Sequence, residues 1–308
     1  MGSHPQPRAR ASRLRAAALA RRASRLCDDG ARAAPGCVTA VRERVTLVLP
    51  LFNQLPLTRV CFESLKATTE PFRVLVIDNG STDGTREFLR AFPYAYPLQV
   101  IENDDNRSVI ASLNRAWPAV ETELLCILHN DTEMIDPTWL TKLVRAFDDP
   151  TVGMTGLFGA KRMRRGGRYV GRTIVHSLAE GPTVRAPGED VVSIDAVCMC
   201  LPKRLLEDIG GLDERYGFYH GFDKDLSLAV RERGLRCRIV HAPFRHHGGG
   251  TRARDFRRDP AREQRDIALR KGAIDHLMTK WGHRMPADAR RLGARVREWL
   301  ASRYPWRP

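Results

Sequence analysis

Short apolar runs alternate with amphipathic segments along the middle of this chain. Apolar runs bounded by polar residues suit strands buried on both faces of a parallel sheet, whereas a 3.6-residue apolar period suits helices. Strand, loop and helix in this alternation predict an α/β fold with a mostly parallel, doubly wound sheet. The predicted strands cover residues 45–50, 72–77, 98–101, 124–128, 152–158, 191–201 and 236–240. The predicted helices cover 56–67, 109–117, 137–147 and 223–234, with another through Phe88 and Leu89.

Acidic and metal-capable side chains follow the ends of the predicted strands. Ligands of open α/β sheets bind beyond the carboxyl ends of parallel strands, which share one edge. Each of these side chains alone also suits a polar turn, but their convergence on one edge favours a site. The positions are Asp78, His129, Asn130, Asp131, Asp223 and Asp225.

The two ends of the chain differ from its middle. Residues 1–44 are rich in arginine and alanine, and we expect a basic extension there, partly disordered or amphipathic. A helix over 11–27 could lie on an anionic membrane, and an arginine-rich leader also resembles an organelle transit peptide. The central domain is expected over 45–251, and a basic helical extension over 252–308. The predicted packing face of that last helix is Ile267, Leu269, Ile274, Leu277, Met278 and Trp281.

Charge and cysteine content narrow the functional classes. The 308 residues include 51 Lys and Arg against 36 Asp and Glu, a formal charge of +15. This excess favours an anionic partner such as nucleic acid, an acidic membrane surface or a phosphorylated substrate. Seven scattered cysteines without a CxxC pair predict free thiols in a reducing cytoplasm. Since no apolar run approaches the ~20 residues of a membrane span, we expect a cytoplasmic protein.

Six motifs fall in the order seen in family-2 glycosyltransferases. The chain resembles this family over 45–251, and in particular its bacterial rhamnosyltransferase-like branch, which builds surface polysaccharides. The resemblance implies a glycosyltransferase A-type (GT-A) fold, in which one α/β catalytic domain binds a nucleotide-sugar and a divalent metal. The motif VIDNGSTDGT at 76–85 is highly specific for the family. The other motifs support the resemblance because they occur in the same order as in the family. The motifs are VTLVLPLFN at 45–53, VIDNGSTDGT at 76–85, LHNDTE at 128–133, IGGLDE at 209–214, GFDKDLSL at 221–228 and HHGGG at 246–250.

The resemblance implies a set of donor-binding residues. Pro50, Leu51 and Asn53 would line the nucleotide base. Asp78 would hydrogen-bond the base or ribose, because a carboxylate accepts from amide and hydroxyl donors. Asn114 also matches an asparagine of the family's donor-side helix, although Ser108 stands where that motif usually has glycine. The implied set is Pro50, Leu51, Asn53, Asp78, Asn79, Asn106, Asn130 and Asp131.

The resemblance also implies a metal site. The sequence at 129–131 aligns with the family's Asp-x-Asp motif, in which Asp131 would ligate the metal and His129 takes the variable first position. His247, or its neighbour His246, would complete the metal shell. The cation, Mn²⁺ or Mg²⁺, offsets the charge that develops on the leaving nucleoside diphosphate. An imidazole ligand favours Mn²⁺ over Mg²⁺, but whether His129 ligates or points away stays open.

A catalytic base is implied in the same way. Asp223 aligns with the aspartate of a Glu-Asp pair that takes the proton of the acceptor hydroxyl in inverting members. The glutamate that usually precedes it is Phe222 here. We expect Asp225 to be a helix N-terminal carboxylate stabilised by the helix dipole. Asp195 and Asp213 are candidates for contact with the sugar or the acceptor.

The leading hypothesis is an inverting, metal-dependent glycosyltransferase that uses a UDP-, GDP- or dTDP-linked sugar in surface polysaccharide or glycan synthesis. A glycan or lipid-linked acceptor fits the basic ends, with peripheral contact at the inner membrane face. A peptide or small-molecule acceptor stays open. Alternatives of other kinds are a nucleic-acid-binding protein, a sugar nucleotidyltransferase and a non-catalytic GT-A homologue. Nucleic-acid binding needs aromatic residues interleaved with basic ones, but aromatics are only 7% of the chain.

Overall fold

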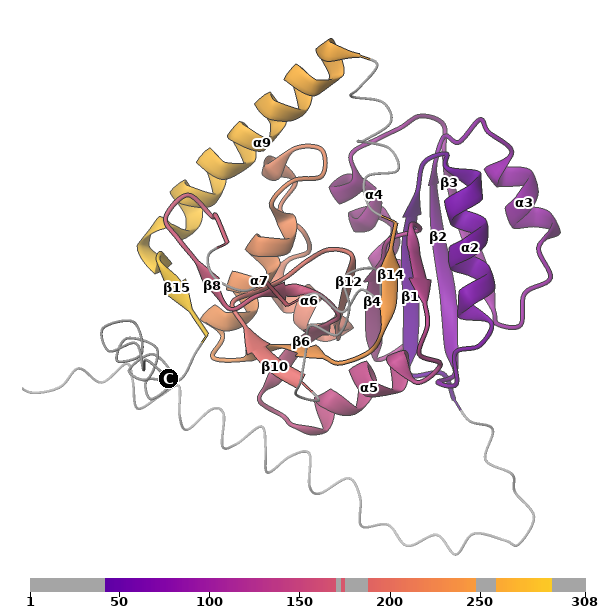
Figure 1. Ribbon diagram of the computed structural model, residues 1–308, viewed down its shortest axis with the longest axis horizontal. Coiled ribbons are helices and arrows are strands. Elements are labelled where there is room, and N and C mark those ends of the chain that lie inside the picture. The colour runs from indigo at the N-terminus through magenta and orange to yellow at the C-terminus, as the bar shows by residue number, and fades with distance from the viewer. Residues whose placement is uncertain (1–41, 170–172, 175–187, 248–258, 290–308) are drawn as a thin grey trace, which may run out of the picture. The chain divides into compact units, whose positions relative to one another are not determined.

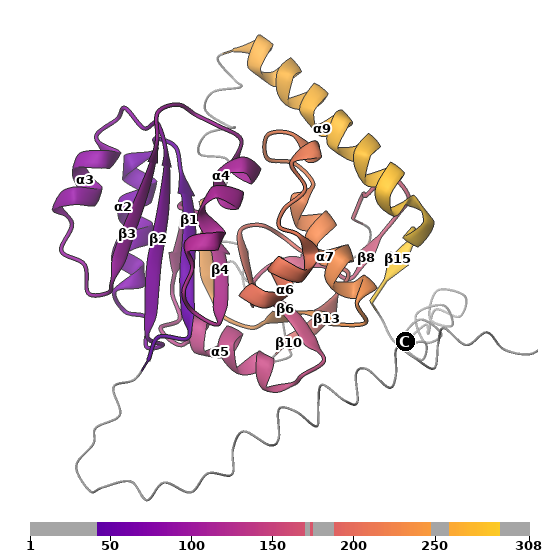
Figure 2. The same cartoon turned by 180° about the vertical axis from the view of Figure 1, so that it is seen from behind.

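The centre of the molecule is an eight-stranded, mostly parallel sheet (Figures 1 and 2). The computed structural model describes residues 42–169, 173–174, 188–247 and 259–289. Neighbouring strands are parallel except that β12 runs antiparallel to β4 and β6, and β10 runs antiparallel to β13. The predicted α/β fold is therefore confirmed. In order across the sheet the strands are β10 (Gly188–Val191), β13 (Arg236–Val240), β6 (Val152–Gly156), β12 (Cys198–Pro202), β4 (Leu124–Leu128), β1 (Val45–Leu51), β2 (Phe72–Asn79) and β3 (Leu98–Asn103).

Helices cover both faces of this sheet, which explains its continuous apolar strands. In β1, Leu47 and Leu49 belong to one buried cluster, whereas Val48 belongs to the other. The first cluster includes side chains of α2 (Leu55–Leu65), α3 (Thr85–Ala91) and α5 (Trp139–Arg145). The second includes side chains of α4 (Val109–Ala116), α6 (Lys203–Ile209), α7 (Phe222–Glu232) and α9 (Pro260–Trp281). Figures 1 and 2 show α2 and α4 on opposite sides of the sheet.

Three small sheets surround the large one and were not predicted. Their strands have two or three residues each, too short for a periodic apolar pattern. The first pairs β5 (Thr132–Met134) with β14 (Phe244–His246). The others pair β7 (Gly159–Ala160) with both β11 (Ser193–Ile194) and β9 (Thr173–Ile174), and β8 (Arg162–Met163) with β15 (Ala287–Asp288).

The predicted strand over 191–201 was wrong as a single element. The segment belongs to three strands, since β10, β11 and β12 lie in two different sheets. Between β11 and β12 the chain turns at Asp195, whose carboxylate accepts a hydrogen bond from the backbone N–H of Val197 at 3.1 Å. An Asp that bonds the backbone two residues ahead forms such a turn. The apolar character of the whole segment concealed this break.

The C-terminal helix α9 packs on the same core as α4 and α7. Ala273, Leu277 and Trp281 of α9 are buried in that cluster, as Leu277 and Trp281 were expected to be. Ile267 was wrongly placed on the packing face, because it is 59% exposed. The predicted helix over 11–27 and the glycines of the HHGGG motif lie outside the described residues. Within the described part of the chain, none of the helices is long and apolar enough to cross a membrane.

Gly156, at the end of β6, tests the packing between the large sheet and β11. A Cβ atom there would lie 2.3 Å from Cγ2 of Ile194 and 2.5 Å from the carbonyl oxygen of Cys198. Gly156→Ala is therefore expected to lower the free energy of unfolding in urea by about 1–3 kcal/mol, as overpacking does. Gly272→Ala in α9 meets no atom within 4 Å and should raise it by up to ~1 kcal/mol. Equal effects of the two changes would contradict this packing.

Candidate active site

The loops after β1 and β2 are joined to each other at one edge of the sheet. Leu51 at the end of β1 lies opposite Asp78 in β2. The backbone N–H of Asn53 donates to Oγ of Ser81 at 2.8 Å, and Oδ1 of Asn53 accepts from the backbone N–H of Thr82 at 2.8 Å. Asn53 has a positive φ of 54°, a conformation that asparagine tolerates better than most residues. The predicted nucleotide-base loop is thus held against the DNGSTDGT loop.

Asp78, the last residue but one of β2, is a fully buried carboxylate with protein partners. Nε of Arg86 donates to its Oδ2 at 2.6 Å, and the backbone N–H of Ser81 approaches both oxygens at 3.2–3.3 Å. A second Arg86 nitrogen donates to the carbonyl oxygen of Asn103 at 2.7 Å. A carboxylate has about four acceptor positions, and these contacts do not occupy all of them. Arg86 is a partner that the sequence analysis missed, although it directly follows the motif.

Other predicted donor-side residues are engaged inside the protein. Oδ1 of Asn79 accepts from Asn103 at 2.7 Å and from Ser112 at 2.6 Å in a buried network. Nδ2 of Asn130 donates to Oγ1 of Thr58 at 2.9 Å. Asn114 donates to the carbonyl oxygen of Leu212. The remaining positions are the buried Leu51, the half-buried Pro50 and the exposed Asn106.

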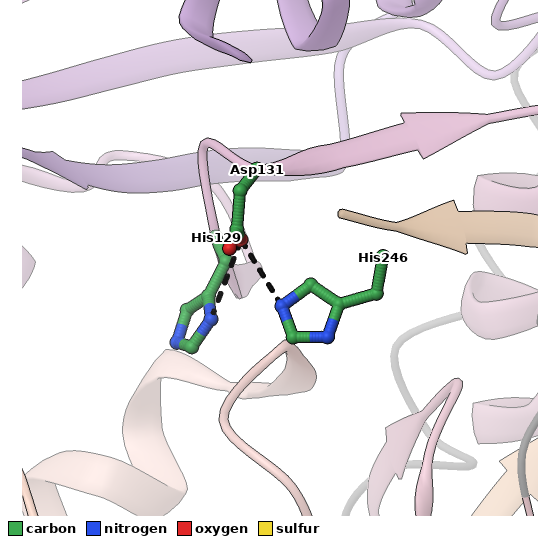
Figure 3. A group of neighbouring side chains, drawn as sticks. All are labelled: His129, Asp131 and His246. Atoms are coloured by element: carbon green, nitrogen blue, oxygen red, sulfur yellow. Dashed lines mark hydrogen bonds and ion pairs between the residues drawn. The ribbon is translucent and has the colours of Figure 1, made fainter. Parts of the chain in front are cut away.

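Three metal-ligating side chains meet beyond the end of β4: His129, Asp131 and His246 (Figure 3). Each offers a ligand atom, and these atoms all lie within 4.8 Å of one another. Nε2 of His246 lies 3.1 Å from Oδ1 of Asp131, and Nδ1 of His129 lies 3.8 Å from the same oxygen. The pairing of β14 with β5 places His246 there, opposite Thr132. Two imidazoles and a carboxylate suit Mn²⁺ and similar cations and leave positions for phosphate oxygens.

Burial and charge act in opposite directions on these three groups. Burial lowers the pKa of His129, and this outweighs the attraction of Asp131. Burial alone would raise the pKa of Asp131, but the hydrogen bond and charge of His246 lower it below its usual value. Burial would lower the pKa of His246, whereas its bond to Asp131 raises it. A neutral His129 and an ionised Asp131 are the protonation states that bind metals.

His247, which was predicted as a ligand, lies beside a different carboxylate. Its Nε2 is 3.2 Å from Oε2 of Glu133, which also accepts from Arg245 at 2.6 Å. His246 instead reaches Asp131, so the structure brings the alternative histidine into the cluster. Neighbouring residues of an extended strand point to opposite faces. Arg245 and His247 therefore share one face, toward Glu133, and His246 points to the other, toward Asp131.

Asp223 lies in the first turn of α7, whose start depends on a glycine. Gly221 has a φ of 82°, and a Cβ atom there would lie 2.8 Å from the ring of Tyr216. Phe222, at the position of the family's usual glutamate, is buried in the core and carries no carboxylate to the site. Burial, together with the negative charge of Asp195, raises the pKa of Asp223 to about 6. Asp223 thus has the property of a base near neutral pH.

Asp225 lies in the first turn of α7, as expected. In addition to the helix dipole, three side chains hold its carboxylate inside the protein. Oδ1 accepts from Trp281 at 2.6 Å and from Tyr216 at 3.0 Å, and Nζ of Lys280 donates to Oδ2 at 3.0 Å. Trp281 and Lys280 are more than fifty positions further along the chain, so local sequence could not predict these bonds.

Asp195 and Tyr169 are further members of this region. Burial raises the pKa of Asp195, and the charges of His246 and Asp131 act on it as well. Oγ of Ser193 and the Tyr169 hydroxyl lie 2.9 Å apart, and Nζ of Lys224 lies 4.9 Å from the centre of the Tyr169 ring. Asp195 was predicted as a candidate for contact with the sugar or the acceptor. Tyr169 was not predicted, because a lone tyrosine in a basic segment carries no motif.

A mostly parallel sheet with a possible metal site beyond β4 agrees with the GT-A fold that the motifs imply. The model of glycosyl transferase family 2 matches residues 46–209, and the chain belongs to this family. It is 31% identical over 231 residues to the O-antigen biosynthesis protein RfbC of Myxococcus xanthus, covering 69% of this chain and 18% of that protein. Glycosyltransferase AglE of Haloferax volcanii is 28% identical over 39% of this chain and 40% of AglE. The chain thus spans less than half the length of these relatives.

Solved structures share the fold at low sequence identity. GalNAc-T7 with UDP, GalNAc and Mn²⁺ has a TM-score of 0.54 at 12% identity, covering 66% of this chain and 43% of that one. TarS 1–349 of S. aureus in complex with UDP has a TM-score of 0.50 at 16% identity, covering 64% and 58%. The predicted glycosyltransferase A-type fold and the predicted membership of family 2 are confirmed.

The two neighbouring histidines provide a matched test of the ligand cluster. His246→Gln should weaken Mn²⁺ binding at least tenfold, because it removes one of three ligand atoms, as losses at metal sites commonly do. His247→Gln should leave Mn²⁺ affinity near that of the unmodified protein, since His247 faces Glu133. Titration calorimetry with Mn²⁺ alone measures both. A larger loss in His247→Gln would restore His247 as the ligand.

Proposed function

We propose that this chain is an inverting glycosyltransferase that moves a sugar from a nucleotide-diphosphate donor to an acceptor hydroxyl. The main support is the cluster of His129, Asp131 and His246, whose ligand atoms all lie within 4.8 Å of one another. Asp223, in the first turn of α7, adds a carboxylate whose pKa is raised to about 6 by burial and by the charge of Asp195. One structural relative was solved with UDP, GalNAc and Mn²⁺ and the other with UDP, and these ligands support a nucleotide-sugar donor for this chain.

Separate groups of residues would bind the metal, bind the nucleoside and accept the proton. Asp131, His129 and His246 would hold a divalent cation, Mn²⁺ or Mg²⁺, which when bound neutralises charge on the diphosphate oxygens. Asp78 and the loop around Asn53 would bind the nucleoside. Asp223 accepts the proton of the acceptor hydroxyl while that oxygen bonds to the anomeric carbon. The bond from this carbon to the diphosphate breaks on the opposite side, so the sugar configuration inverts.

Surface polysaccharide or glycan synthesis is the process that we propose. The likeness to an O-antigen biosynthesis protein supports it. We place the protein in the cytoplasm with peripheral contact to the inner membrane face, where a glycan linked to a lipid diphosphate would be the acceptor. A hairpin with the exposed side chains of Arg164, Arg165 and Arg168 supports contact with an anionic membrane surface. The backbone N–H of Arg164 donates to the carbonyl oxygen of Arg168 at 2.8 Å, so like charges face each other across the hairpin.

Asp223→Asn tests the base assignment. The variant should retain Mn²⁺-dependent binding of a UDP-, GDP- or dTDP-sugar from a panel, because the amide has nearly the same shape. Transfer should fall about 10²–10⁴-fold, the usual contribution of a positioned base. Kinetics of sugar transfer and calorimetry of donor binding measure the two effects. Absence of donor binding and turnover across the whole panel in the unmodified protein would refute the proposed function.

The same assignment sets the pH dependence of transfer. Only ionised Asp223 can accept a proton, and its pKa is raised to about 6. The rate constant for transfer should be constant well above pH 6 and should fall about tenfold per unit as the pH drops below it. The residual activity of Asp223→Asn should lack this decline. An unchanged decline in the variant would assign the proton acceptor to another group.

Charge reversal of the hairpin tests the membrane contact. Each basic residue near an anionic surface contributes ~1 kcal/mol, so changing Arg164, Arg165 and Arg168 to glutamate should weaken binding to phosphatidylglycerol vesicles about 100-fold or more. A matched control changes the exposed arginines Arg90, Arg145 and Arg204 to glutamate, which alters the net charge equally. Vesicle sedimentation measures both variants. Equal losses in both would show that net charge alone drives the binding.

A further inference from the structure

Helix α9 is bound to the loop that leads to the proposed base by three clusters around carboxylates. We call residues 213–221 the base-side loop, since Asp223 follows it by two positions. Each cluster joins α9 to this loop or to the first turn of α7. None of these residues lies in the 46–209 segment that the family model matches. The three carboxylates are Asp213 in the loop, Asp225 in α7 and Asp266 in α9.

Two of the clusters hold the C-terminal half of α9. Nε2 of His276 lies 3.1 Å from Oδ2 of Asp213, and Nζ of Lys280 lies 2.9 Å from the same oxygen. Lys280 also donates a hydrogen bond to Asp225, and the next residue, Trp281, donates a second one to the same carboxylate. The single ammonium group of Lys280 therefore joins the beginning of the base-side loop to the first turn of α7. These bonds fix both ends of the segment that carries Asp223.

Asp266, in the N-terminal half of α9, holds the last part of the base-side loop. The side chain of Asp266 is 5% exposed. Oδ1 accepts from the Tyr219 hydroxyl and lies 2.8 Å from Nε2 of His220, while Arg270 approaches Oδ2 at 3.3 Å. Charge-assisted hydrogen bonds are roughly twice as strong as neutral ones. A buried carboxylate with these partners restrains Tyr219 and His220, directly before Gly221 and the base.

The opposite side of the base-side loop is bound to the donor-side helix α4. Oγ of Ser108 donates to the carbonyl oxygen of Gly217 at 2.8 Å, and the backbone N–H of Val109 donates to that of Phe218 at 2.9 Å. Ser108 stands where the family motif usually has glycine, which could not make the side-chain bond. The base-side loop is therefore held between α4 and α9.

We propose that Asp266 is a positioning residue for Asp223. This inference rests on the proposed function, because it assigns Asp266 a role in transfer through the proposed base. Asp266 does not touch the site; through Tyr219 and His220 it fixes the loop that sets where α7 begins. A displacement of about 1 Å in a reacting group can lower a rate by about 10²-fold. Loss of this restraint reduces proton transfer to Asp223 but leaves the metal and nucleotide contacts intact.

The test compares Asp266→Asn with Asp275→Asn in the same helix. Asp275 is exposed and contacts Lys271 at 2.8 Å, so its change controls for loss of a carboxylate from α9. In Asp266→Asn, amide hydrogen exchange should accelerate in residues 218–226 and remain unchanged in β1 and β4. The rate constant for transfer should fall about 10–100-fold, with unchanged Kd for UDP in Mn²⁺. Asp275→Asn should match the unmodified protein in all three measurements.

Several outcomes would overturn the inference. Unchanged hydrogen exchange in residues 218–226 would show that Asp266 does not restrain the loop. Equal losses of transfer and UDP binding would indicate general destabilisation. If amide hydrogen exchange in residues 218–226 is faster but the rate constant for transfer is unchanged, the loop does not position Asp223 for transfer. If the unmodified protein transfers no sugar, the proposed function fails, while the exchange measurement still decides whether Asp266 holds the loop. If Asp266→Asn does not fold, His220→Asn removes one partner of the same carboxylate and takes its place.

Discussion

The parallel register of β1, β2 and β4 is the constraint on which the candidate site depends. Val48 of β1 lies opposite Leu75 on one side and Ile127 on the other, so the three strands end near one edge. Their loops then carry Asp78 and Asp131 to that edge. Both faces of these strands are covered by helices, and a slip of one residue would exchange the two apolar faces. The same burial that stabilises the sheet therefore fixes the position of the site.

The strands of this sheet could be predicted because their apolar runs are continuous, but the direction of each polar side chain could not. Asp78 and Asn79 are consecutive residues of β2 and point to opposite faces. Asp78 meets Arg86 of α3, whereas Asn79 meets Ser112 of α4. The motif locates both residues at the edge of the sheet. Which of them faces a ligand depends on helices packed from either side, and no local pattern encodes that.

The pairing of β5 with β14 could not be predicted for a different reason. It joins segments more than a hundred residues apart through strands of three residues, which leave no periodic signal. The choice between His246 and His247 depends on this register, because strand residues alternate between faces. Similarly, Ile267 fits a helical apolar period, yet the buried positions nearby are Asp266 and Ala273. A buried carboxylate with hydrogen-bond partners there overrides the apolar pattern.

His129 and Phe222 stand where the family usually has carboxylates, and both changes alter the charge of the candidate site. When both imidazoles are neutral, as metal ligands are, the ligand cluster carries one formal negative charge, on Asp131. A divalent cation there would keep net positive charge to attract diphosphate oxygens. Phe222 removes a second carboxylate and packs into the core instead. An additional anion beside Asp223 would raise its pKa further, since like charges disfavour ionisation. Burial and the charge of Asp195 raise the pKa of Asp223 only to about 6, so the proposed base is ionised at neutral pH.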